Sequence, residues 1–195
     1  MKTLLISALA LAACVAGPAC ATTQIDTTGD LVGGIARNDL DIRSFSVFRD
    51  GGDFVLSASL LGLIDPASDA RYVFGINRGG GGAPFAGHDG IRFNTTAVVK
   101  GDGSSTLGAF TVKGDVVSGR IAVASLVPNG LDPADFGFSL WTRPNGAAIV
   151  DFAPDNSTFK ASVPEPATWA MMVLGFGAMG AMLRGGRRRS EPALG

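Results

Sequence analysis

Residues 39–60 read DLDIRSFSVFRDGGDFVLSASL, a run in which apolar and polar residues alternate on both sides of a central Asp-Gly-Gly-Asp. A short run of aspartates and glycines such as this one is typical of a tight turn between two strands. The positions expected to face a core are Leu40, Ile42, Phe45, Val47, Phe54, Leu56, Ala58 and Leu60. The alternation slips by one residue near Ser44, which predicts a β-bulge. The run therefore predicts a bulged β-hairpin with one buried face.

The chain after this hairpin consists of short runs rich in Val, Ile, Phe and Thr, separated by turns of glycine, aspartate and proline. Further strands are expected at residues 72–77, 91–100, 107–113, 116–117, 121–127, 136–142 and 147–152. Residues 78–90, RGGGGAPFAGHDG, are predicted to be a flexible loop, because consecutive glycines cost backbone entropy on ordering. The pattern predicts an all-β domain, an antiparallel β-sandwich of about nine strands.

The start of the chain has the features of a secretory signal peptide. Lys2 precedes an apolar run at residues 4–16, and Ala19-Cys20-Ala21 fits the small-residue cleavage pattern. We expect residues 1–21 to be removed by cleavage between Ala21 and Thr22. One alternative stays open: Leu11-Ala12-Ala13-Cys14 fits a lipoprotein pattern, in which Cys14 would be lipidated and become the new N-terminus.

The end of the chain has the features of a membrane anchor. Residues 167–183 contain no charged side chain and would reach roughly 25 Å as a helix, near the lower limit for crossing a bilayer. Arginines follow at 184 and 187–189, and positive residues tend to stay on the cytoplasmic side. We therefore expect one transmembrane helix. The body, a sandwich at residues 22–152 and a linker at 153–163, would lie beyond that membrane.

The tail at residues 164–195 also carries a motif. Pro164-Glu165-Pro166 is followed by Trp169-Ala170 and, after the apolar run, by the arginine cluster. This order and spacing resemble the PEP-CTERM sorting signal in its PEPxxWA variant. The resemblance implies recognition by an exosortase, a membrane-embedded cysteine transpeptidase of Gram-negative bacteria, and export often alongside exopolysaccharide. The residues expected to be read are Pro164, Glu165, Pro166, Trp169, Arg187, Arg188 and Arg189.

A second resemblance concerns the opening hairpin. Residues 39–47, the turn that begins at Asp50 and the strand at 54–60 are similar to the first hairpin of DOMON-like and glucodextranase C-terminal sandwich domains. Some members of those families bind sugars, haem or calcium. The resemblance implies a β-sandwich fold for the body.

The composition of the body argues against several classes of function. The body carries 11 basic and 15 acidic residues, all of the latter aspartates, which argues against a nucleic-acid partner. Both cysteines lie within residues 1–21, so the mature body can form no disulfide and offers no thiol nucleophile. The body has a single histidine, His88, and no Gly-x-Ser-x-Gly elbow. We assign no catalytic, cofactor-binding or metal-ligating residue.

Two sets of residues are candidates for ligand binding, and each also has an ordinary structural interpretation. Six aspartates occur early in the body, and calcium prefers carboxylate oxygens, although aspartate is also a common turn residue. They are Asp26, Asp30, Asp39, Asp41, Asp50 and Asp53. Trp141 and Tyr72 could form a platform for stacking sugars, or could be buried in the core.

These observations predict an exported, non-enzymatic protein of the cell surface or extracellular matrix, sorted by an exosortase. The alternative is a carbohydrate- or calcium-binding module associated with exopolysaccharide.

Overall fold

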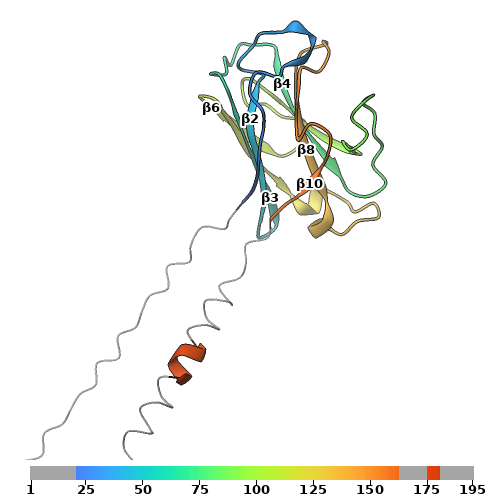
Figure 1. Ribbon diagram of the computed structural model, residues 1–195. Coiled ribbons are helices and arrows are strands. Elements are labelled where there is room, and N and C mark those ends of the chain that lie inside the picture. Colours follow the sequence, from blue (N-terminus) through green and yellow to red (C-terminus); the bar gives the residue numbers. More distant parts are fainter. Residues whose placement is uncertain (1–20, 163–174, 181–195) are drawn as a thin grey trace, which may run out of the picture. The chain divides into compact units, whose positions relative to one another are not determined.

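The predicted hairpin is present in the computed structural model, which describes residues 21–162 and 175–180 (Figure 1). Strands β2 (Ile42–Asp50) and β3 (Asp53–Leu60) pair antiparallel, and their register shifts between Ile42 and Ser44. This shift confirms the predicted bulge. All eight side chains expected to face the core are at most 1% exposed.

The hairpin lies at the centre of the first sheet. Strand β1 (Thr22–Ile25) pairs with β2 on one side, and β7 (Val116–Ala122) pairs with β3 on the other. Strand β6 (Ala109–Lys113) completes the order β1-β2-β3-β7-β6. Each pairing is antiparallel.

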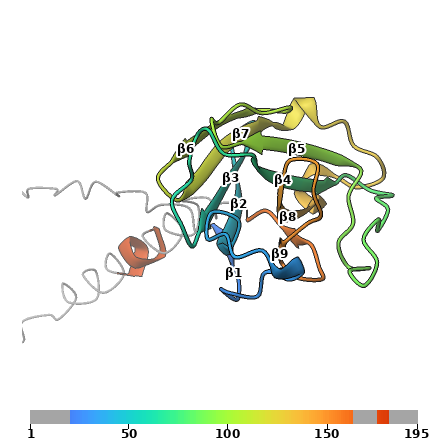
Figure 2. The same cartoon turned by 90° about the horizontal axis from the view of Figure 1, so that it is seen from above.

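The second sheet is built around β4 (Ala70–Asn77) and β8 (Gly137–Pro144), which pair along eight residues. Strand β5 (Thr95–Lys100) adds to β4, while β9 (Asp151–Ala153) and β10 (Phe159–Lys160) add to β8. Figure 2 shows the domain from above, with β2 and β3 of the first sheet beside β4 and β8 of the second. The described residues thus form an all-β fold of two antiparallel sheets with ten strands.

Phenylalanines join the two sheets in one core. The ring of Phe45 in β2 lies 5.5 Å from that of Phe74 in β4 and 5.0 Å from that of Phe159 in β10. In the same way Phe54 of β3 lies 4.9 Å from Phe138 of β8. Burying an aromatic side chain of this size contributes roughly 1.5–3 kcal/mol, so these contacts are a main source of sheet-to-sheet stability.

Three short 3-10 helices lie in the connections, at Val32–Gly34, Val123–Ser125 and Pro133–Asp135. The second of them corrects the predicted strand at 121–127, because β7 ends at Ala122. The predicted strand at 91–100 begins only at Thr95.

The glycine-rich loop at 78–90 is irregular, as predicted, but it is held by specific contacts. The Asn77 side-chain oxygen accepts hydrogen bonds from the backbone amides of Gly79 (3.0 Å) and Gly81 (3.1 Å). Gly79 has a φ of +108°, and a Cβ there would lie 2.2 Å from the Asn129 carbonyl oxygen. Farther along, Phe85 packs on Trp141 over the outer face of the second sheet. The loop is therefore part of the packed structure.

Residues 153–163, predicted to be a linker, contribute β10 and a further bridge to the first sheet. The Ser162 amide donates to the Val47 carbonyl (3.2 Å), and the Ser162 carbonyl accepts from the Arg49 amide (2.8 Å). The Thr22 amide also donates to the Ser162 hydroxyl oxygen, at 3.0 Å. The β-domain thus runs to Ser162, where the chain that follows β10 meets the start of β1 beside β2.

Within residues 21–162 and 175–180, no helix has the length and apolar character needed to cross a bilayer. Residues 175–180 are helical. The rest of the predicted transmembrane segment at 167–183 lies outside the described residues. So do residues 1–20 of the predicted signal peptide and all seven residues expected to be read by the exosortase.

Candidate metal centre and sorting signal

The segment that follows β1 brings aspartates to one end of the sandwich. The Asp26 amide donates to the Arg43 carbonyl (3.0 Å), and the Val32 amide donates to the Val150 carbonyl (2.8 Å). Between them, the Gly29 amide donates to Oδ2 of Asp41 at 2.8 Å. Gly29 has a φ of +86°, a conformation that other residues rarely adopt. The segment is therefore held between the start of β2 and the start of β9.

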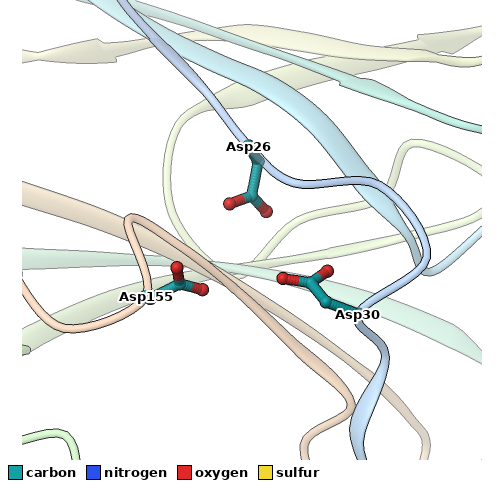
Figure 3. A group of neighbouring side chains, drawn as sticks. All are labelled: Asp26, Asp30 and Asp155. Atoms are coloured by element: carbon teal, nitrogen blue, oxygen red, sulfur yellow. The ribbon is translucent and has the colours of Figure 1, made fainter.

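Five aspartates meet there, and we call them the acidic cluster: Asp26, Asp30, Asp41, Asp151 and Asp155. They form two groups of three that share Asp30. Each residue of a group offers one carboxylate oxygen, and those oxygens all lie within 4.8 Å of one another. Figure 3 shows the group of Asp26, Asp30 and Asp155, whose carboxylates face one another from two separate segments. The other group consists of Asp30, Asp41 and Asp151.

The inner part of the acidic cluster is deeply buried. Asp41 is 1% exposed and Asp151 is 4% exposed. Both oxygens of Asp151 accept backbone hydrogen bonds, Oδ2 from Ile42 (2.6 Å) and Oδ1 from Phe152 (2.7 Å). Oδ1 of Asp41 and Oδ2 of Asp26, in contrast, are buried with no hydrogen-bond partner among the described residues. Leaving a buried carboxylate oxygen unpaired costs free energy, and a cation bound beside these two atoms would reduce that cost.

Burial and mutual repulsion shift the ionisation of these carboxyls. Removal from water, followed by the neighbouring Asp151, Asp155 and Asp30, raises the pKa of Asp26 to about 8. Removal from water also raises the pKa of Asp151 to about 7, against the lowering effect of its two backbone hydrogen bonds. Without a cation, ionising either carboxyl is therefore less favourable in the folded protein than in the unfolded chain.

No basic side chain compensates the acidic cluster within the part of the chain that the structure describes. The six ion pairs found there all involve other aspartates. The arrangement is thus a set of closely spaced oxygen ligands with an excess of negative charge, which is what a hard divalent cation requires.

Sequence reasoning identified part of this site. Of the six early aspartates, Asp26, Asp30 and Asp41 come together, whereas the other three lie elsewhere. Asp39 pairs with Arg37 (2.6 Å), and Asp50 and Asp53 pair with Arg120 (2.8 and 3.5 Å). Asp151 and Asp155 were not predicted. Asp151 begins a strand of only three residues and Asp155 follows that strand, which is too short for the pattern of apolar residues to place the two aspartates beside the N-terminal segment.

His88 lies near the acidic cluster, where its contacts are those of a residue that holds the structure together. Its ring stacks on Phe152 with a centroid distance of 4.3 Å, and its Nδ1 donates to the Asp155 carbonyl at 2.5 Å. The neighbouring Gly90 amide donates to the Asn156 side-chain oxygen (2.8 Å). These contacts fasten the glycine-rich loop to the segment that carries Asp155.

The predicted sugar platform is not assembled, because its two aromatic residues lie on opposite faces of the second sheet. Tyr72 is fully buried in the main core, where its hydroxyl donates to the Asp39 carbonyl (3.0 Å). Trp141, 5% exposed, belongs to a separate cluster on the outer face of the second sheet. Trp141 borders a groove of about 330 Å³ there, together with Phe85, Phe93 and Arg143.

Residues 21–162 form an all-β domain of two antiparallel sheets. Residues 162–189 match the PEP-CTERM protein-sorting motif. The match begins at Ser162, the last described residue of the β-domain, and confirms the resemblance seen in Pro164-Glu165-Pro166 and the arginine cluster. The comparison with curated proteins gives no match. The resemblance to DOMON-like domains is not confirmed.

The matched motif supports the interpretation that this is a surface protein, exported, anchored in a membrane and sorted by an exosortase. It also implies that an exosortase processes the chain.

Proposed function

We propose that this protein is a non-enzymatic component of the cell surface or extracellular matrix of a Gram-negative bacterium. Its β-sandwich is exported behind a signal peptide, held in the inner membrane by the C-terminal segment and handed to an exosortase. The single observation that carries the proposal is the PEP-CTERM match at residues 162–189.

The position of the match supports the proposal. Ser162 is bonded to β2 through its amide and its carbonyl, and Pro164 follows two residues later. Cleavage near the Pro-Glu-Pro triplet would therefore release a folded domain without removing any of its strands. The contacts of His88, stacked on Phe152 and bonded to a carbonyl, favour a structural role for that residue and agree with a non-enzymatic body.

The test is mass spectrometry of the protein isolated from its native host, beside a variant in which Pro164, Glu165 and Pro166 are all replaced by alanine. For the natural sequence we expect an N-terminus at Thr22 and a C-terminus near the triplet. The variant should keep Arg187 to Arg189 and accumulate in the inner-membrane fraction.

The matched control is Glu191→Ala, which removes a glutamate beyond the matched residues and should leave processing unchanged. Normal processing of the triple variant would refute sorting through this motif. A mature N-terminus at a lipidated Cys14 would replace the proposed signal-peptide cleavage with the lipoprotein route.

A second candidate function is a calcium- or carbohydrate-binding module associated with exopolysaccharide. The acidic cluster favours the calcium part of this alternative, because the three carboxylate oxygens of each group lie within 4.8 Å of one another, close enough to contact one ion. The carbohydrate part lacks its proposed platform, since Tyr72 is fully buried.

A further inference from the structure

We propose that the acidic cluster is a Ca²⁺ site, with the ion held by the inner group of Asp30, Asp41 and Asp151. Asp26 and Asp155 lie beside this group and supply further oxygens.

Two independent observations carry the proposal. The first is geometric: each group of three carboxylate oxygens lies within 4.8 Å. Two oxygens on opposite sides of a Ca²⁺ ion are about 4.6–5.2 Å apart, since calcium–oxygen distances are about 2.3–2.6 Å. Around Mg²⁺ the same separation is about 4.0–4.2 Å, and that ion demands near-octahedral geometry. The three oxygens of a group are therefore close enough to contact one Ca²⁺ ion, whose coordination geometry is the more adaptable of the two.

The second observation is an unpaired buried oxygen. Asp41 is 1% exposed, and its Oδ2 is held by the Gly29 amide, while its Oδ1 has no partner among the described residues. Because Asp41 contributes to the group with Asp30 and Asp151, this side chain is fixed in place beside two other ligand carboxylates. A buried anion of this kind is stabilised by a cation and destabilised without one.

The ligand set points to calcium by its chemistry as well. All five side chains are carboxylates, which are hard oxygen donors, whereas Zn²⁺ sites are built mainly from cysteine and histidine. The only histidine nearby, His88, has its Nδ1 bonded to the Asp155 carbonyl.

A bound ion would join parts of the molecule that are distant in sequence. Asp30 belongs to the segment after β1, Asp41 directly precedes β2 in the first sheet, and Asp151 begins β9 in the second sheet. Calcium would thus fasten the two sheets and the N-terminal segment to one another. We expect a dissociation constant of about 10⁻⁴–10⁻³ M, the range of extracellular calcium modules. This expectation rests on the proposed export of the domain.

The test uses the full chain, purified in a mild detergent and stripped of metal with a chelator. Its melting temperature is measured against CaCl₂ and, at matched ionic strength, against MgCl₂. We expect a saturable rise with Ca²⁺ and a clearly smaller one with Mg²⁺, because a ligand specific to the native state must stabilise that state. Equal shifts with the two salts, or no shift, would overturn the proposal.

The decisive variant is Asp30→Asn, since Asp30 is exposed and belongs to both groups. We expect its calcium affinity to fall by at least about tenfold, as ligand charge sets affinity at such sites. Without metal, its melting temperature should equal or exceed that of the natural protein, because one repelling charge is gone. A residue with a merely structural role would lower it instead.

Asp132→Asn is the matched control, because Asp132 is exposed and lies outside the acidic cluster. It precedes the short 3-10 helix Pro133–Asp135, and its side chain makes no capping hydrogen bond to that helix. This variant should keep the full calcium response. An unchanged calcium response in Asp30→Asn would overturn the proposal. This outcome would leave the sorting function untouched, since processing at the Pro-Glu-Pro triplet is measured separately.

Discussion

Asp26 is partly buried and Asp151 is buried, and both carboxyls lie among other aspartates. Their pKa values rise to about 8 and about 7, from an ordinary value near 4 in an unfolded chain. The cause is mainly burial, which disfavours the charged form, and for Asp26 also the neighbouring carboxylates. Ionising either group in the metal-free fold therefore costs stability.

The pH dependence of stability follows from these two residues. A raised folded-state pKa means that the folded protein holds protons that the unfolded chain has released, so stability falls as pH rises from about 4 through about 8. We expect the melting temperature of the metal-free protein to decrease between about pH 5 and about pH 9. Asp26→Asn should make this decrease smaller, and Asp132→Asn should not change it. A melting temperature that is constant or rises over this range would contradict the assignment.

Among the elements, the pairing of β6 with β7 depends on a glycine. Gly119 lies directly opposite Phe110, and a Cβ at that position would lie 2.4 Å from the Phe110 ring and 2.5 Å from the Ala109 carbonyl oxygen. The Phe110 ring in turn stacks on Phe74, with a centroid distance of 5.2 Å. The missing side chain at Gly119 thus makes room for an aromatic contact between the sheets.

Gly119→Ala should therefore displace the Phe110 ring or separate β6 from β7. We expect a loss of about 1–3 kcal/mol in the free energy of unfolding, the usual cost of overpacking, measured by urea denaturation. The matched control is Gly52→Ala in the hairpin turn, where a Cβ would meet nothing within 4 Å. That change should stay within about 0.5 kcal/mol. Equal effects of the two substitutions would argue against the close approach at Gly119.

For the molecule as a whole, the important feature is that both sheets bury their inner faces in one core. Phe45 and Phe54 of the first sheet contact Phe74, Phe138 and Phe159 of the second. The sheets should therefore unfold together, while the edge strands should open locally at a lower free energy.

Hydrogen exchange measured by mass spectrometry tests this expectation. Peptides from β3, β4 and β8 should exchange slowest and at a common rate, because each of these strands has a neighbour on both sides. Peptides from β6 and β5, at the sheet edges, should exchange earlier. If β3 exchanged long before β4 and β8, the two sheets would be independent units and the single core would be refuted.

The local pattern of apolar and polar residues was sufficient to predict much of the fold. Alternation along residues 39–60 predicted the hairpin, its buried face and its bulge, because each of these depends on neighbouring residues. Strands β1 and β10 were not predicted, since runs of four and two residues carry too little periodicity. Their pairing partners, β2 and β8, are what make them strands.

By itself, the sequence determined the all-β class and the sorting signal, because strand periodicity and a linear motif are written in consecutive residues. Only the tertiary structure decided the acidic cluster. Asp30 and Asp151 are 121 positions apart in the sequence, and they meet because the segment after β1 and the start of β9 lie at the same end of the sandwich. A site made of oxygens from distant segments depends on distances in space, and spacing along the chain does not reveal those distances.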